Sequence, residues 1–157
     1  MHILSQSLAI AAILANGVVY GTDVFCAIVL RPALANVGDA ELTSVMGQVH
    51  RYGDRRMPIP GALGIVTALL SAIVAAVSGR PAAAICAGVA TVSLLAWLAV
   101  YAKVSAPVNK QLTAAATEGT TPGNVRALQH TWDSVINLRV ALQLIALLAL
   151  CCAVVTA

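Results

Sequence analysis

The sequence has few charged residues and few aromatic ones. Charged residues make up 10% of the 157 residues and aromatic residues 4%, whereas a soluble domain carries about 25% charged residues. So little charge excludes a soluble domain with a wetted surface. The net charge of +3 is too small to indicate a nucleic-acid partner. With 60% hydrophobic residues and a mean hydropathy of +0.90, the chain is expected to be an integral membrane protein whose main partner is the lipid bilayer.

Cysteine motifs and alternating strands are also lacking. The four cysteines, Cys26, Cys86, Cys151 and Cys152, lie in apolar runs and form no CxxC motif. Buried thiols usually behave as small hydrophobic residues, so these cysteines indicate packing and not redox chemistry. No run alternates between polar and apolar residues, which argues against a membrane β-barrel.

Four long apolar runs are what the sequence does contain, over about residues 3–30, 59–78, 82–102 and 135–155. Each has the roughly 20 residues that a helix needs to cross a bilayer. The first run lacks a basic start and is too long for a signal peptide, so it is expected to remain as a helix. The prediction is an all-α fold: a four-transmembrane-helix bundle forming a single integral membrane domain over residues 1–157.

The charge distribution predicts how this multi-pass chain is oriented. Four spans place both termini on one side, together with the short turn at Arg80, and place the long loops 31–58 and 103–133 on the other. Basic residues gather in the long loops, so the positive-inside rule predicts that these loops are cytoplasmic and the termini opposite. The basic residues of the long loops are Arg31, Arg51, Arg55, Arg56, Lys103, Lys110 and Arg126.

The two long loops are expected to contain short amphipathic helices. Residues 39–52 have acids early, bases late and an apolar stripe, which predicts a helix along the membrane surface. After a break at Pro107, the segment 113–124 is rich in turn residues and is expected to be an exposed loop. A second short helix is predicted over 125–133, leading into the fourth span.

Two charges inside the apolar runs indicate a polar site within the bundle. A charge at the bilayer centre costs roughly 2.5–3.5 kcal/mol and usually faces the bundle interior. Asp23 lies two turns into the bilayer from the loop side, about 12 Å from Arg31, and Arg139 lies at a comparable depth in the last run. The sequence therefore predicts an Asp23–Arg139 ion pair, which either fixes the helix packing or belongs to a functional pocket.

Two histidines lie just outside the spans, one in each long loop. His50 has Asp54 at i+4, and His130 has Asp133 at i+3, so both pairs are within reach on a helix. Two interpretations remain open at this point. One is a general-base histidine oriented by a carboxylate, and the other is a metal site formed by His50, His130, Asp54 and Asp133.

Several short strings, spread over about residues 15–150, resemble one known family. They are GVVYGTDVF followed by RPAL, then MPIPGALG, VSAPVNKQL and TWDSVINLRVALQL. Their most specific positions are Ser105, Pro107 and Asn109, and Trp132 with Asn137 and Arg139. Together they resemble the DUF1772 family of small four-helix membrane proteins, to which the anthrone oxygenases of fungal polyketide pathways belong.

The resemblance implies oxidation of a hydrophobic phenolic or anthrone-type substrate by O₂. A histidine would remove a proton from the central CH₂ group, and cationic or amide side chains would stabilise the enolate. The enolate can react directly with O₂, so no cofactor is required. The catalytic candidates are His50, His130, Arg139, Asn109 and Asp23, and the candidates for substrate contact are Trp132, Tyr101, Lys103 and Asn137.

Other functions fit the same residues. A metal-dependent variant would bind iron or copper at the histidines and carboxylates, and a haem is a further alternative. A protein of a different class would be a non-catalytic accessory or assembly subunit. Gly17 and Gly21 form a GxxxG motif that would let a neighbouring helix approach closely, which predicts a homo-oligomer or a larger membrane complex.

Overall fold

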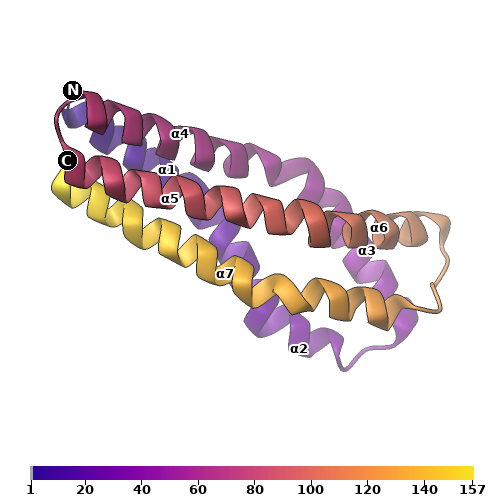
Figure 1. The fold of residues 1–157 in the computed structure, drawn as a ribbon. Helices are drawn as coiled ribbons and strands as arrows, with labels where there is room; N and C mark the ends of the chain where they lie inside the picture. Colours follow the sequence, from indigo (N-terminus) through magenta and orange to yellow (C-terminus); the bar gives the residue numbers. More distant parts are fainter. Residues whose placement is uncertain (1) are drawn as a thin grey trace.

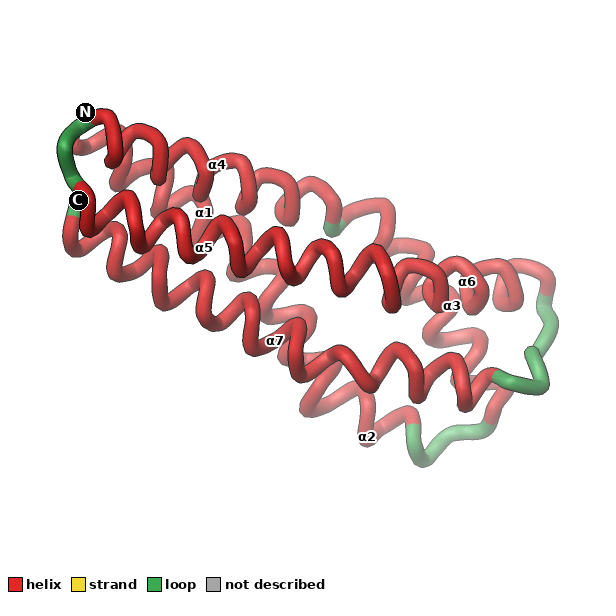
Figure 2. Tube along the Cα trace, viewed as in Figure 1, coloured by secondary structure: helices red, strands yellow, loops and turns green. Residues whose placement is uncertain are grey.

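The computed structural model describes residues 2–157, and over this range it contains helices and no strand (Figure 2). Four helical stretches are long and apolar enough to cross a membrane, namely His2–Leu34, Pro58–Val77, Pro81–Glu118 and Val125–Thr156. The predicted all-α bundle is therefore confirmed, and the chain is a multi-pass integral membrane protein.

Two of the four stretches are built from several helical elements joined end to end. Helix α1 (His2–Phe25) continues through a π-helical turn (Cys26–Leu30) into the short α2 (Arg31–Leu34). Helix α5 (Pro81–Val100) continues through a second π-helical turn (Tyr101–Ser105) into α6 (Ala106–Glu118). The remaining helices, α3 (Asp39–Arg56), α4 (Pro58–Val77) and α7 (Val125–Thr156), are uninterrupted.

The predicted break at Pro107 is wrong, whereas the helix predicted over 125–133 does lead into the last span, as the first part of one continuous helix. Pro107 lies in the first turn of α6, directly after the π-helical turn, and the first turn of a helix tolerates proline. The helix therefore runs on to Glu118, and the exposed loop begins only at Gly119, whose φ of +67° ends the helix. At the other loop end, α7 begins at Val125 and crosses the bundle as one helix.

The four long helices run side by side, as Figure 1 shows. Both chain ends and the tight α4–α5 turn, where Gly79 has a φ of +69°, lie at one end of the bundle. Helices α2, α3 and α6 and the two loops lie at the other, the loop end (Figure 1). This arrangement agrees with the topology expected from four spans.

The interior differs between the two ends. Toward the chain termini the core consists largely of alanines, including Ala9, Ala12, Ala68 and Ala90, all fully buried. Toward the loop end the core contains larger side chains, including Leu42, Met46, Leu112 and Ile136. Small residues let helices approach closely within the membrane. The bundle is therefore tightest near the termini and wider near the loops, where the site described below lies.

Helix α3 was expected to lie along the membrane surface, but its buried face packs on protein. Leu42 and Met46 are fully buried in the cluster that also contains Leu112 of α6. The other two residues of the predicted stripe, Val45 and Val49, remain exposed. The amphipathic helix therefore exists, but half of its apolar stripe covers α6.

The contact between α3 and α6 depends on Gly47. A Cβ atom at this position would overlap the Ala116 Cβ and the Leu112 carbonyl oxygen, both on α6. We therefore expect Gly47→Ala to lower the free energy of unfolding by about 1–3 kcal/mol, the usual range for overpacking. Gly53→Ala on the same helix is the matched control, because its Cβ would meet nothing within 4 Å. Unfolding of both variants in detergent checks the prediction, which fails if they behave alike.

The predicted GxxxG contact is not made by any helix of the described chain. A Cβ atom at Gly17 or at Gly21 would meet no atom within 4 Å in residues 2–157. A different glycine, Gly64 of α4, faces the backbone of Asn16 on α1, and a Cβ atom at Gly64 would lie 3.5 Å from the Asn16 nitrogen. The close approach between these two spans therefore uses Gly64.

Candidate functional site

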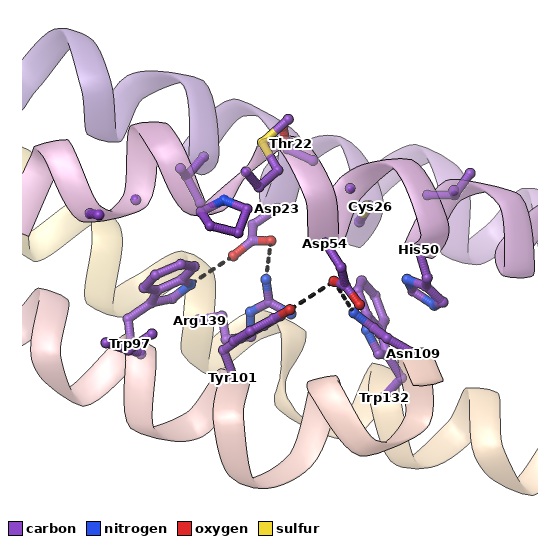
Figure 3. A pocket seen from close by; sticks show the side chains of 18 of the residues that line it. Thr22, Asp23, Cys26, His50, Asp54, Trp97, Tyr101, Asn109, Trp132 and Arg139 are labelled. Carbon is purple, nitrogen blue, oxygen red and sulfur yellow. Dashed lines mark hydrogen bonds and ion pairs between the residues drawn. The ribbon is translucent and has the colours of Figure 1, made fainter. Parts of the chain in front are cut away.

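A cavity of about 280 Å³ lies at the wider part of the bundle, close to the lower end of the roughly 300–1,000 Å³ range of small-molecule sites. Residues of α1, α3, α4, α5, α6, α7 and both π-helical turns line it, and most of them are apolar. Its polar side chains come from several of these helices, as Figure 3 shows. They include Asp23, His50, Asp54, Tyr101, Asn109 and Arg139.

The predicted ion pair between Asp23 and Arg139 is confirmed. Asp23 Oδ1 accepts a hydrogen bond from Arg139 Nη2 at 2.6 Å, and both side chains are buried. Asp23 Oδ2 accepts two more, one from Trp97 Nε1 at 3.1 Å (Figure 3) and one from Gln143 Nε2 at 2.6 Å. The carboxylate is thus bonded on both oxygens, which a buried charge requires.

Arg139 is held in a cage of aromatic rings. Its guanidinium carbon lies 5.5 Å from the ring centroids of Tyr101 and Trp132 and 5.8 Å from that of Trp97. Cation–π attraction at these distances stabilises a desolvated guanidinium. Nη1 donates to Ser105 Oγ at 2.9 Å, while the buried Nε atom has no partner in the described chain. Among the donors that Arg139 retains is this Nε–H group.

Asp54 is bonded to the helix across the cavity from α3. Its Oδ1 atom accepts hydrogen bonds from Tyr101 Oη at 2.7 Å and from Asn109 Nδ2 at 2.8 Å (Figure 3). The structure records no hydrogen bond between Asp54 and His50 among residues 2–157. The carboxylate therefore connects α3 to the α5–α6 helix and does not directly orient the imidazole.

His50 lines the cavity with a nitrogen that is not used. Its side chain is 4% exposed, and its Nε2 atom has no hydrogen-bond partner within residues 2–157. The ring lies 5.6 Å from that of Trp132. Burial lowers the pKa of His50 to about 4, an effect that the Asp54 carboxylate opposes and the Arg139 charge reinforces. The imidazole is therefore neutral near pH 7, with burial making it a weaker base than an exposed histidine.

This buried neutral histidine predicts a loss of stability in acid. The unfolded chain has the ordinary histidine pKa of 6.5 and the folded chain a pKa of about 4, so the unfolded state binds more protons between these values. The stability that His50 contributes is complete above pH 6.5 and falls as the pH drops to 4, by at most about 3 kcal/mol. The difference between wild type and His50→Gln in the pH dependence of the free energy of unfolding gives the contribution of His50. Equal slopes for the two proteins would contradict it.

The structure does not bring the other predicted site residues into the cavity. His130, Asn137 and Lys103 are exposed, and Asp133, half-buried, accepts a hydrogen bond from Gln129 at 3.0 Å. Of the four predicted metal ligands, only His50 and Asp54 line the cavity. Residues 2–157 contain no group of three or more His, Cys, Asp or Glu side chains that could hold a metal ion. The predicted four-ligand site is therefore not formed.

Helix geometry explains this separation. Trp132 and Arg139 lie seven residues apart on α7 and share the face that lines the cavity. His130, Asp133 and Asn137 fall at other angles on the same helix and are turned away from that face. The two histidines therefore lie at the same end of the bundle but not in the same site.

Sequence reasoning missed the bond from Trp97 to Asp23 and the two π-helical turns. The first turn brings Cys26 to the cavity, and the second brings Tyr101 there and Ser105 to Arg139. Pro32 and Pro107 follow these turns by two residues. A proline cannot donate to the preceding turn, so each one marks a place where the regular hydrogen-bond pattern ends. The positions of these two prolines were therefore the signal in the sequence that could have indicated the two π-helical turns.

The arrangement combines an apolar chamber, a neutral imidazole with a free nitrogen and a guanidinium with a free donor. Such a chamber can accept a flat hydrophobic molecule, the imidazole can accept a proton, and the guanidinium can stabilise a negative charge. No family model matches the chain, and neither a curated protein nor a solved structure matches it.

Proposed function

We propose that this protein is a membrane-embedded oxygenase that oxidises a hydrophobic phenolic of the anthrone type with O₂. The observation that carries the proposal is the buried His50 Nε2 atom, which has no partner among the described residues and belongs to a side chain that lines an apolar cavity. Buried polar atoms are nearly always hydrogen-bonded. An unpaired one beside a cavity supports a ligand that completes the bond. The resemblance to the anthrone oxygenases supplies the substrate class.

The reaction begins with a proton transfer to His50. The imidazole takes a proton from the CH₂ group of the anthrone, and the electron pair left behind spreads into the ring system as an enolate. The enolate gives electrons to O₂, and a carbon–oxygen bond forms to give a hydroperoxide, which recovers the proton from His50. Loss of water then gives the quinone. Overall, one CH₂ group and one O₂ become one C=O group and one H₂O.

Arg139 stabilises the negative charge that forms in this first step. In the resting site its charge is balanced by Asp23 at 2.6 Å, and its Nε donor remains free. A preorganised donor in a water-poor site is worth about 10²–10³-fold in rate. The three aromatic rings around the guanidinium keep water away and present flat faces to an aromatic substrate.

The proposal is tested by supplying an anthrone to the detergent-purified protein under air. We expect quinone formation faster than the spontaneous oxidation of the anthrone, with one O₂ consumed per quinone and no added cofactor. Heat-denatured protein is the control for the spontaneous rate. A rate equal to that of the control would contradict the proposal.

The orientation follows from the basic residues of the loop end. Seven of the nine Lys and Arg residues lie in the two long loops, Arg139 lies inside the bundle, and Arg80 lies in the turn at the chain-terminal end. By the positive-inside rule we place both long loops in the cytoplasm and both termini on the opposite side. The cavity then lies nearer the cytoplasmic face, where a lipid-soluble substrate enters between helices.

A second candidate function is assembly into a homo-oligomer or a larger complex. The observation that favours it is the open face at Gly17 and Gly21, where no helix of the described chain packs. A metal- or haem-dependent function retains only His50 and Asp54 of its four candidate ligands in the cavity. An absorption spectrum with elemental analysis separates this function from the cofactor-free one. A stoichiometric metal or a Soret band that is lost in His50→Ala favours the metal or haem protein.

A further inference from the structure

A second hollow, the basic groove, lies between α3 and α6 at the loop end. Its volume is about 490 Å³, and it is lined by Arg51 and Arg55 of α3 and by Lys110, Thr113 and Thr117 of α6, among others. Asp54 borders both the groove and the cavity. The groove therefore adjoins the candidate site at Asp54.

The three cations of the groove have no partner within residues 2–157. Only two ion pairs occur in this range, Arg126–Asp39 and Arg139–Asp23, and none of the groove cations makes a side-chain hydrogen bond there. The one acid of the groove, Asp54, already accepts two bonds from Tyr101 and Asn109. The groove thus holds three positive charges and one carboxylate, whose Oδ1 atom is already bonded.

The free side-chain donors of the groove favour an anionic ligand. Thr113 donates its hydroxyl hydrogen to the Gly47 carbonyl, and Thr117 donates to the Thr113 carbonyl. Free donors therefore come from the guanidinium groups of Arg51 and Arg55 and the ammonium group of Lys110. Guanidinium groups bind phosphate through paired hydrogen bonds, and lysine adds a point charge.

The position of the groove near the membrane surface indicates that this anion is a lipid headgroup. Arg55 lies three residues before Pro58, where the membrane-spanning α4 begins, so it is about one helical turn from the apolar span. Tyr52, between Arg51 and Arg55 in the chain, is half exposed and typical of the membrane–water interface. Clustered cations at this depth attract anionic headgroups.

We propose that the basic groove binds the phosphate headgroup of an anionic phospholipid. The lipid phosphate contacts Arg51, Arg55 and Lys110, and its acyl chains lie along the bundle. This site is independent of the proposed oxygenase activity, because it needs neither His50 nor Arg139. Because the bound lipid contacts both α3 and α6, the stability of the contact between these helices then depends on the lipid composition of the membrane.

Native mass spectrometry of the full chain in a neutral detergent tests the proposal. Phosphatidylglycerol and phosphatidylcholine with identical acyl chains are added, and bound lipid is counted. Wild type is expected to retain phosphatidylglycerol in preference, and each single change to glutamine in the groove is expected to weaken this binding about fivefold. The triple variant R51Q/R55Q/K110Q is expected to lose the preference. The triple variant R31Q/R56Q/R80Q, with the same change in net charge outside the groove, is expected to keep it.

Three outcomes would overturn the proposal: equal retention of both lipids by wild type, equal loss in the two triple variants, or displacement of phosphatidylglycerol by inorganic phosphate at the same concentration. The last result would make the ligand a soluble phosphate. Because Arg55 and Lys110 are exposed and Arg51 is partly exposed, these variants are expected to fold. Circular dichroism and melting without added lipid check this, and K110Q alone provides a milder test.

Discussion

Arg139→Gln is expected to lower the free energy of unfolding by about 3–5 kcal/mol, because it leaves the Asp23 carboxylate buried without a counter-charge. The two groups are 2.6 Å apart, with side chains 7% and 4% exposed. Asp23→Asn is expected to have a loss of similar size, since it leaves the guanidinium without its anion. SDS-induced unfolding in mixed micelles, followed by tryptophan fluorescence and circular dichroism, measures both.

The double variant Asp23→Asn/Arg139→Gln is expected to recover most of this loss. It removes both charges together, and a buried pair replaced as a whole often costs little. Asp39→Asn is the control, because it breaks the exposed Asp39–Arg126 pair, for which about 0–1 kcal/mol is expected. If the single losses at Asp23 and Arg139 simply add in the double variant, the two charges do not depend on each other and the interpretation is wrong.

The Asp23–Arg139 pair is also the part of the site that could be predicted from the sequence. Charged residues are so rare inside the spans that Asp23 had one available partner of opposite sign at its depth, and an unpaired charge in lipid is costly. The four spans were predictable for a related reason, because the length of an apolar run is fixed by the thickness of the bilayer. In both cases a single strong constraint, the cost of an unpaired charge in lipid or the thickness of the bilayer, left few alternative structures.

The two histidines could not be assigned in the same way. His50 and His130 have similar positions relative to the spans and similar nearby carboxylates, yet one is buried in the cavity and the other is exposed. What separates them is the angle of each residue around its helix, relative to neighbours that are distant in sequence. On α3, His50 shares its buried face with Met46, whereas on α7 His130 lies away from Trp132. The spacing of His50 and Met46 shows that they share a face of the helix, but it does not show whether that face is buried until the packing partner is known.

The continuity of α5 with α6 was unpredictable because proline has two opposite effects. It interrupts a helix when its N–H group is needed, but it is favoured in the first turn of a helix. Pro107 is of the second kind, because the π-helical turn Tyr101–Ser105 ends just before it. That turn places Tyr101 against Asp54 and Ser105 against Arg139. A local irregularity therefore supplies two of the hydrogen bonds around the cavity.

His50→Gln is expected to lower kcat/KM for anthrone oxidation by about 10²–10⁴-fold, the usual contribution of a general base. Glutamine fills much of the same space but cannot accept and return a proton. His130→Gln is the matched control, because the same change is made on an exposed side chain outside the cavity. Initial rates of quinone formation and O₂ uptake measure both, with circular dichroism to show that the variants are folded.

The pH profile separates a catalytic His50 from a merely structural one. With a pKa of about 4 in the folded protein, the base remains neutral through the range in which an ordinary histidine becomes protonated. The wild-type rate should therefore persist through pH 6.5 and fall only toward pH 4, while the residual rate of His50→Gln lacks this inflection. A fall centred at 6.5, or an equal loss in His130→Gln, would assign the proton transfer to another group and leave the unpaired His50 nitrogen as a substrate-positioning contact.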